Sequence, residues 1–358
     1  MENLVKKLEK IYRGYGYNPY TMSKFEEYEL YLRNKDFLIS DRILTFTDTD
    51  GKLMALKPDV TLSIIKNSQD TEAGIQKLFY RENVYRPGKS DQGFREIMQI
   101  GLECMGAVDA YCVLEVLLLA VKSLQAISTD CVLDVSHMGL LSGLLDRCGL
   151  MGAARQKALA AIAGKNSHEL RQVCQDADVD PDKLVLLTET SGRADRVIPA
   201  LEPVFGTDAE FVQFKALLNA LVNTGVNCVN VDFSVINDMK YYNGIVFRGF
   251  VEGVPTGVLS GGEYDALMTK MSRKGKAIGF ALYPDLLDRL LAEPQIKGVD
   301  AILVYDADAD LTALAAAMDY LTKQNLTVSA QPCTSGSVYT GKVYKLVGNE
   351  VKCIENDA

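Results

Sequence analysis

Residues 94–106 read FREIMQIGLECMG, and the alternation along this stretch decides the fold. In an extended strand its apolar residues share one face: Met98, Ile100, Leu102 and Cys104. The other face carries polar residues: Arg95, Gln99 and Glu103. The pattern fits a half-exposed strand with a wet face, and it fits equally a central strand whose polar face forms the floor of a ligand pocket.

The residues just upstream favour the pocket. Residues 78–86, LFYRENVYR, give a second strand pattern that ends in Arg86. The connecting residues 87–93, PGKSDQG, combine glycine with polar side chains, as loops do. Two strands joined by a polar loop, with arginines facing inward, suit a phosphate ligand, so we expect Arg86 to contact a phosphate.

The flanking segments predict an α+β protein. Residues 43–46 and 53–56 surround DTDG at 48–51, a hairpin-turn signal. Residues 138–225 are rich in Ala and Leu at helical spacing and predict a helical insertion. Strand patterns resume at residues 229–235, where apolar residues alternate through Val229, Val231, Phe233 and Val235.

The last part of the chain predicts a separate small domain. Residues 277–292 favour a helix, and Pro294 follows them. Residues 301–305, 311–324 and 326–328 then alternate as strand, helix and strand, which is typical of a β-α-β unit. We therefore expect two domains, a core over 1–295 and a small α/β segment over 298–358.

Composition excludes several classes of protein. Hydrophobic residues make up 48% and charged residues 24%, as in ordinary globular chains. The net charge of −9 has the wrong sign for a surface that attracts nucleic acid overall. Apolar runs are too short for a membrane span, so we expect no contact with a membrane. Eight scattered cysteines without a CxxC pair fit reduced thiols, which predicts a cytoplasmic location.

Histidine is scarce, and this limits the chemistry. Only His137 and His168 are present, so a histidine-built metal site or a Ser-His-Asp triad has almost no material. We expect His137 to be a packed or capping residue. No metal and no cofactor are expected.

Several motifs, in order along the chain, resemble the catalytic core of histidyl-tRNA synthetase and its paralogues. They are FTDTDGKLMALKPDVT at 46–61, QIGLECMG at 99–106, YYNGIVF at 241–247, GGEYD at 261–265 and AIGFA at 277–281. The resemblance covers about residues 10–292. It implies a class II aminoacyl-tRNA-synthetase-like antiparallel sheet flanked by helices.

The same resemblance implies a pocket for histidine. Asp59 and Thr61 match positions that bind the amino group, and four further residues match positions that hold the amino group and the imidazole: Gln99, Glu103, Tyr242 and Tyr264. The carboxylate of a bound histidine needs a hydrogen-bond donor, and Arg95, on the same strand face as Gln99 and Glu103, is the nearest candidate.

Positions on the ATP side depart from the family pattern. An adenylating enzyme must neutralise charge on the α-phosphate. The matching positions hold Asn237, Leu286, Gly88 and Glu263. Arg289, one turn beyond Leu286, compensates only in part for the arginine missing there. We therefore expect no catalytic residues and no aminoacyl-adenylate chemistry.

The tail argues in the same direction. Residues 298–358 hold 4 Lys, no Arg and 8 Asp plus Glu, a poor surface for a tRNA backbone. A retained core with lost arginines and a reduced tail resembles the branch formed by regulatory subunits of ATP phosphoribosyltransferase. This implies a non-catalytic subunit that works with a short catalytic subunit in the first step of histidine biosynthesis. The resemblance also implies that the chain dimerises through residues 12–31 and assembles with the catalytic subunit into a hetero-oligomer. It further implies that the chain responds to histidine and binds no tRNA.

Two alternatives stay open on the sequence alone. One is a divergent histidyl-tRNA synthetase that uses Arg86, Arg95 and Arg289. The other is a synthetase-like binding protein with a different ligand or partner, because a shared fold does not fix function.

Overall fold

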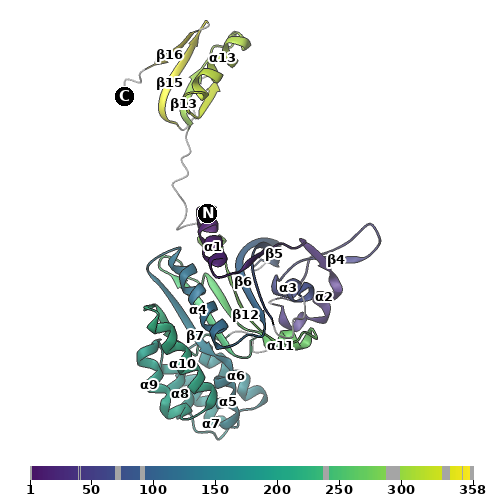
Figure 1. Ribbon diagram of the computed structural model, residues 1–358, viewed down its shortest axis with the longest axis vertical. Helices are drawn as coiled ribbons and strands as arrows, with labels where there is room; N and C mark the ends of the chain where they lie inside the picture. The colour runs from purple at the N-terminus through teal and green to yellow at the C-terminus, as the bar shows by residue number, and fades with distance from the viewer. Residues whose placement is uncertain are drawn as a thin grey trace. The chain divides into compact units, whose positions relative to one another are not determined.

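The computed structural model describes residues 2–38, 40, 42–68, 74–88, 93–236, 242–287, 299–332, 339–348 and 350–354. They belong to two compact units, Met1–Leu290 and Leu291–Ala358, each described here by itself. Figure 1 shows their helices and strands.

A nine-stranded sheet forms the centre of the first unit, in the order β1-β5-β6-β12-β11-β10-β7-β9-β8. The strands are β1 (Asn18–Tyr20), β5 (Ile75–Pro87), β6 (Phe94–Gly106), β7 (Cys131–His137), β8 (Gly192–Arg193), β9 (Val229–Val231), β10 (Ile245–Val251), β11 (Leu259–Glu263) and β12 (Lys276–Leu282). Pairing is antiparallel from β5 through to β7, as predicted. Strand β1 pairs with β5 in parallel, and β9 pairs with β7 in parallel, so the whole sheet is mixed.

Two local predictions were wrong. Residues 277–292 do not begin as a helix, because Lys276–Leu282 is the strand β12 between β6 and β11. A short apolar run fits a buried strand as well as a helix, and only the neighbouring strands decide. The strand expected over 229–235 ends at Val231. There the Asp232 side chain accepts the Ser234 N–H at 2.9 Å and starts a turn.

Helix α4 (Ala110–Gln125) covers one face of the sheet, where it packs on β7, β10 and β12 (Figure 1). Its N-terminus is capped by Asp109, whose carboxylate accepts the Cys112 N–H. Helix α1 (Glu2–Gly14) packs on α4, and Tyr12 Oη lies 2.9 Å from Ser123 Oγ. A Cβ on Gly249 would touch Leu124 of α4, so the neighbouring Arg248 faces the opposite side of the sheet.

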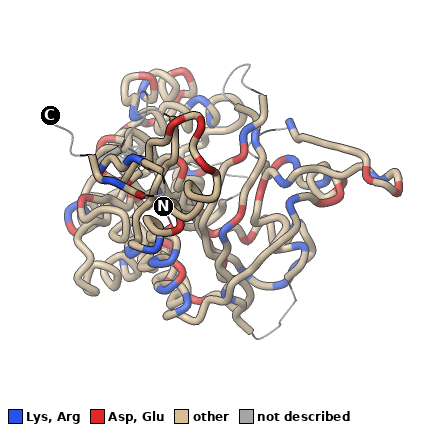
Figure 2. Tube along the Cα trace, turned by 90° about the horizontal axis from the view of Figure 1, so that it is seen from above, with Lys and Arg blue, Asp and Glu red and all other residues tan. Residues whose placement is uncertain are grey.

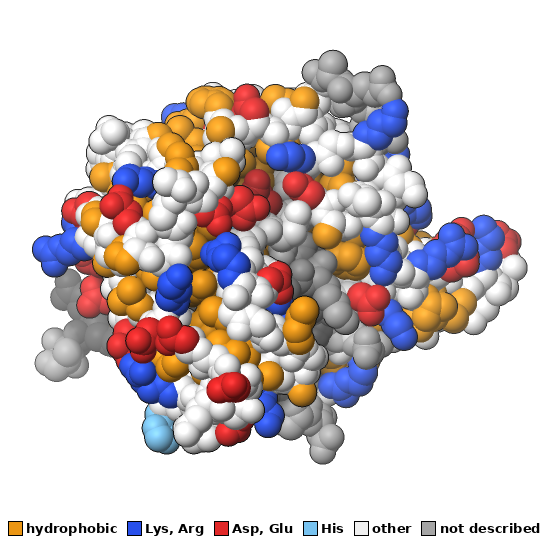
Figure 3. Space-filling model, turned by 90° about the horizontal axis from the view of Figure 1, so that it is seen from below, with side chains coloured by type: hydrophobic (Ala, Val, Ile, Leu, Met, Phe, Trp, Pro, Cys, Tyr) orange, Lys and Arg blue, Asp and Glu red, His pale blue; other side chains and the backbone are white. Residues whose placement is uncertain are grey.

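A small sheet projects from the first unit, in the order β2-β4-β3. It consists of β2 (Phe25–Glu27), β3 (Thr45–Thr47) and β4 (Leu53–Leu56), with α2 (Tyr28–Arg33), η1 (Lys35–Phe37) and α3 (Thr61–Asn67) beside it. The predicted hairpin is confirmed, and Asp48 Oδ1 accepts the Asp50 and Lys52 N–H groups in its turn. In Figure 3 the projecting hairpin carries apolar side chains next to charged ones.

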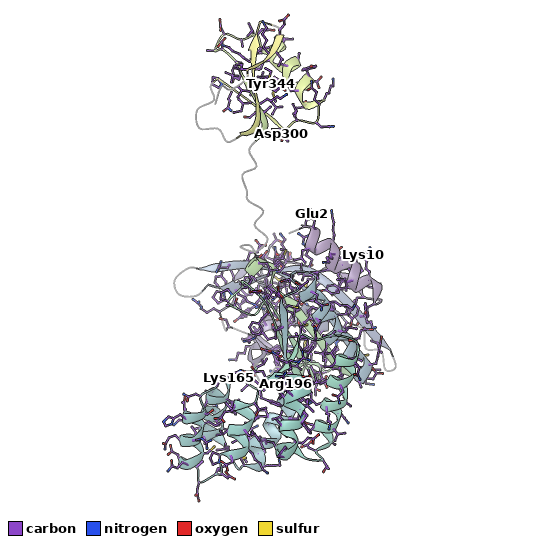
Figure 4. All side chains as sticks on the ribbon, turned by 90° about the vertical axis from the view of Figure 1, so that its left-hand side faces the viewer. Glu2, Lys10, Lys165, Arg196, Asp300 and Tyr344 are labelled. Atoms are coloured by element: carbon purple, nitrogen blue, oxygen red, sulfur yellow. The ribbon has the colours of Figure 1, made fainter. Side chains whose placement is uncertain are left out.

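The predicted helical insertion is confirmed. It consists of α5 (Met138–Arg147), α6 (Gly152–Ala163), α7 (Ser167–Asp176), α8 (Asp182–Glu189), α9 (Ala194–Phe205) and α10 (Ala209–Asn223). His137 Nδ1 accepts the Leu140 N–H at 3.3 Å, so this histidine is a half-buried capping residue, as expected. Lys165 Nζ, whose residue is labelled in Figure 4, lies 2.6 Å from Asp232 Oδ2 and ties the insertion to the end of β9.

The second unit is a four-stranded sheet with one described helix, in the order β14-β13-β15-β16. Its elements are β13 (Val299–Val304), α13 (Leu311–Thr322), β14 (Val328–Gln331), β15 (Tyr339–Val347) and β16 (Glu350–Ile354). The parallel β13-α13-β14 unit matches the sequence pattern, and the β15–β16 hairpin was not predicted. Asp300, labelled in Figure 4, bonds the Thr327 N–H at 2.8 Å.

Among the residues that the structure describes, no helix is both long and apolar enough for a membrane span.

Candidate functional site

A cavity of about 440 Å³ lies over the face of the central sheet that α4 leaves uncovered. Neighbouring strands contribute residues to it in register: Glu103 of β6 lies opposite Gly279 of β12, and Ala281 of β12 lies opposite Ser260 of β11. The cavity therefore sits at the centre of the sheet, where alternation along each strand sends every second side chain into it.

Glu103 lies deep in this cavity and is only 2% exposed. Its Oε1 accepts a hydrogen bond from Thr61 Oγ1 at 3.0 Å, and its Oε2 accepts one from Tyr264 Oη at 2.5 Å. Burial raises the pKa of Glu103 to about 8, against the two hydroxyl bonds. No lysine or arginine within the described ranges contributes to this shift. The carboxyl group is thus poised to accept a cationic or hydrogen-bonding ligand.

Glycines make room for this carboxyl group. A Cβ on Gly279 would lie 1.8 Å from Glu103 Oε2, and a Cβ on Gly262 would lie 2.6 Å from the ring of Tyr242. Real Cβ atoms do not approach so closely, so both positions require glycine for close contact with site residues.

Asp59 and Arg86 form a second polar wall. Asp59 Oδ1 accepts the Leu62 N–H at 3.0 Å near the start of α3, and Asp59 Oδ2 lies 3.8 Å from Arg86 Nη2. Burial raises the pKa of Asp59, while the Arg86 guanidinium acts in the opposite direction. Arg86 Nε also donates to the Pro58 carbonyl at 2.8 Å. This arginine therefore has protein partners of its own.

A buried ion pair supports that wall. Lys57 is fully buried, and its Nζ lies 2.5 Å from Glu82 Oε2. Glu82 Oε1 accepts the Met22 N–H at 3.2 Å. Because Lys57 is two residues before Asp59, the pair fixes the chain segment that carries the site acid.

Most of the residues singled out from the sequence meet in this cavity. Its lining includes Asp59, Thr61, Arg86, Gln99, Glu103, Tyr242 and Tyr264. Arg95 lies outside the lining and is exposed. It is directly opposite Arg86 on the neighbouring strand, and two cations at such a pair of positions repel each other. Arg86 is the half-buried member of the pair, and Arg95 lies in solvent.

Sequence reasoning missed five polar residues of the lining: Tyr80, Arg248, Thr256, Ser260 and Tyr283. A signal existed for two of them. Tyr80 is two residues before Glu82 in β5 and so shares its face of the sheet. Arg248 directly follows the YYNGIVF motif and shares the face of Val246 in β10.

The positions that depart from the family pattern have other roles where they are described. Glu263 Oε2 accepts the Ile245 N–H at 2.7 Å, and burial raises the pKa of Glu263. Leu286 is 43% exposed in η2 (Pro284–Leu287). The Gly88 N–H donates to the Gly93 carbonyl at 2.7 Å. Asn237 and Arg289 lie outside the described residues.

Comparison with known proteins gives consistent findings. Residues 1–287 match the family model for histidyl-tRNA synthetase. The chain is 26% identical over 348 residues to the ATP phosphoribosyltransferase regulatory subunit of Oceanobacillus iheyensis, which covers 94% of this chain and 85% of that protein.

Two solved structures share the fold. One is an ATP phosphoribosyltransferase regulatory subunit/histidyl-tRNA synthetase from Bacillus halodurans, with a TM-score of 0.73 and 21% identity over 92% of this chain and 88% of that chain. The other belongs to the ATP phosphoribosyl transferase (HisG:HisZ) complex from Thermotoga maritima, with a TM-score of 0.64 and 19% identity over 78% and 96% of the two chains. These likenesses confirm the predicted class II synthetase-like fold.

Proposed function

The chain belongs to the histidyl-tRNA synthetase family. From this premise we propose that it is a regulatory subunit of an ATP phosphoribosyltransferase, required by a short catalytic subunit in the first step of histidine biosynthesis in the cytoplasm. The observation that carries this proposal is the likeness, over 94% of the chain, to a relative that bears this name. The solved HisG:HisZ complex, whose title names two components, supports a separate catalytic partner.

Within this role we propose that the chain does not form an aminoacyl-adenylate. Two departures support this, because the Glu263 carboxylate is committed to a backbone N–H and Leu286 is an exposed aliphatic residue. Neither supplies the positive charge that an α-phosphate needs. The test is ATP–pyrophosphate exchange in the presence of histidine. We expect exchange at background level, and clear exchange would favour the divergent synthetase.

We further propose that histidine binds in the cavity. An imidazole and an ammonium group need acceptors, and Glu103 and Asp59 supply acids in two parts of the lining. Thr61, Gln99, Tyr242 and Tyr264 supply further polar groups around them.

Calorimetry with Glu103→Ala tests the histidine site. A ligand cation beside Glu103 favours its ionised form, and loss of the resulting charged hydrogen bond is expected to weaken binding by about ten- to a hundredfold. The matched control is Glu96→Ala, an exposed glutamate on the same strand. Equal binding by Glu103→Ala and the wild type would contradict the assignment.

Self-association is a second proposal about partners. The predicted pairing region, residues 12–31, contains Phe25, which is 45% exposed and lies 5.5 Å from the ring of Phe46. Leu32, just beyond it, is 50% exposed. Burying such side chains against a second copy is favourable. Light scattering at micromolar concentration is expected to give a dimer mass, and a monomer mass would contradict the proposal.

We also propose that the chain does not bind tRNA at physiological salt. Acidic and basic residues are interspersed along the trace in Figure 2. The tail adds more acids than lysines, so the cationic track that a phosphate backbone requires has little support. Gel shift with tRNA is the measurement. A tight complex that weakens steeply with salt would refute the proposal.

A further inference from the structure

The cavity extends beyond the residues that the proposed histidine site uses. Its far end is lined by Arg248 of β10, Ser260 of β11, and Tyr283 just after β12. Ser260 Oγ and Tyr283 Oη form a hydrogen bond at 3.2 Å. Thr256, in the connection between β10 and β11, adds a third hydroxyl group to the lining.

Small residues separate this end from the acidic end. Across the sheet, Gly101 lies opposite Ala281, Ala281 opposite Ser260, and Ser260 opposite Arg248. Adjacent strands lie about 4.8 Å apart, so this row spans roughly 14 Å from β6 to β10. The row itself contributes no large side chain between its ends, and the ring of Tyr80 from the neighbouring strand β5 lies over Gly101.

The Arg248 stem is supported by close packing. A Cβ on Gly257 would lie 2.7 Å from both Cγ and Cδ of Arg248, so only glycine at position 257 permits the observed path of the stem. Across the next strand pair Arg248 faces Asp134, which accepts a hydrogen bond from Asn230 Nδ2 at 3.2 Å. A guanidinium keeps its charge at every physiological pH. The cavity therefore has Glu103, Asp59 and the paired Arg86 at one end and a second guanidinium, that of Arg248, at the other.

We propose that Arg248, together with the hydroxyl groups of Thr256, Ser260 and Tyr283, forms a subsite for an oxyanion, either a carboxylate or a phosphate. Guanidinium and hydroxyl groups are the donors that such oxyanions use in proteins. The subsite is distinct from Arg86, which bonds the Pro58 carbonyl and Asp59. It goes beyond the proposed function, since it concerns a ligand group rather than a regulatory role.

Calorimetry on the full chain tests this subsite with three probes: inorganic pyrophosphate, histidine and histamine, which lacks the carboxylate. Arg248→Gln is expected to weaken binding of pyrophosphate or of histidine by about tenfold or more, with histamine unchanged. Weakening of pyrophosphate identifies a separate phosphate group as the occupant. Weakening of histidine alone identifies the amino acid's own carboxylate. Arg95→Gln makes the same charge change on an exposed side chain outside the cavity and should leave all three affinities unchanged.

A second pair of variants protects the test against misfolding. Arg248→Lys keeps the charge and should restore part of the lost affinity, and Thr256→Val removes one hydroxyl donor and should weaken the same probe. The proposal is overturned if Arg248→Gln binds the probes as Arg95→Gln does, or if the wild type binds neither pyrophosphate nor histidine. If Arg248→Gln fails to fold, the proposal is overturned when Thr256→Val binds pyrophosphate and histidine as tightly as the wild type does. Activation of the catalytic partner is measured separately, so the regulatory proposal and this one fail independently.

Discussion

Replacing Glu103 by glutamine is expected to stabilise the protein at alkaline pH. Burial raises the pKa of Glu103 from 4.5 to about 8. The folded state therefore holds a proton that the unfolded state releases above its own pKa. The contribution of Glu103 to stability is most favourable below about pH 4.5 and is lost progressively as the pH rises towards 8. The shift corresponds to at most about 5 kcal/mol of unfolding free energy. Glu103→Gln abolishes this dependence, and its amide still bonds Thr61 and Tyr264.

The assay is urea unfolding of both proteins from about pH 5 to about pH 9, because stability changes most in that window. The difference in unfolding free energy, variant minus wild type, should grow with pH. Glu96→Gln is the control on the same strand, since hydrogen bonds from Asn83 and Tyr85 lower the pKa of Glu96 from 4.5. Its contribution to stability therefore changes only at lower pH, and the variant's difference from the wild type should stay flat across this window. A pH-independent loss of stability in Glu103→Gln would refute the reasoning, because it would mean that Glu103 is ionised in the folded state.

Two further predictions concern the walls of the cavity. Gly279→Ala places a Cβ against Glu103, so we expect a loss of about 1–3 kcal/mol in unfolding free energy and weaker histidine binding. The control Gly143→Ala in helix α5 should be tolerated, and equal thermal stability of the two variants would contradict this prediction. Lys57→Met leaves the Glu82 carboxylate without its buried partner and should lower the unfolding free energy by about 3–5 kcal/mol. Adding Glu82→Leu to this variant should restore most of the loss, and additive losses in urea unfolding would argue against a coupled pair.

Period-two alternation made much of the fold predictable. The β6 pattern at residues 94–106 located the central strand and the polar face that carries Glu103. The apolar run at residues 277–281 misled, since its strand state depends on hydrogen bonds to β6 and β11 that local sequence does not contain. Asp232 ended a strand early because its side chain competes with the sheet for backbone N–H groups.

The candidate site was predictable where motifs marked it and less so elsewhere. Glu103 and Tyr264 meet at 2.5 Å although 161 positions separate them, and the family motifs placed both at one pocket. Arg95 and Arg248 show the limit. Strand alternation gives the face of a side chain but not its position along a sheet that is many strands wide, so an exposed arginine was selected and a cavity-lining one was missed.

The central claim is that this chain serves a separate catalytic subunit and performs no aminoacylation chemistry itself. The most direct measurement is phosphoribosyl transfer to ATP by a short catalytic subunit, assayed alone and after titration with this chain. The account predicts negligible transfer by either protein alone, and activity that rises with added chain until a fixed ratio is reached. Full activity of the catalytic subunit without this chain, or no gain on its addition, would contradict the account.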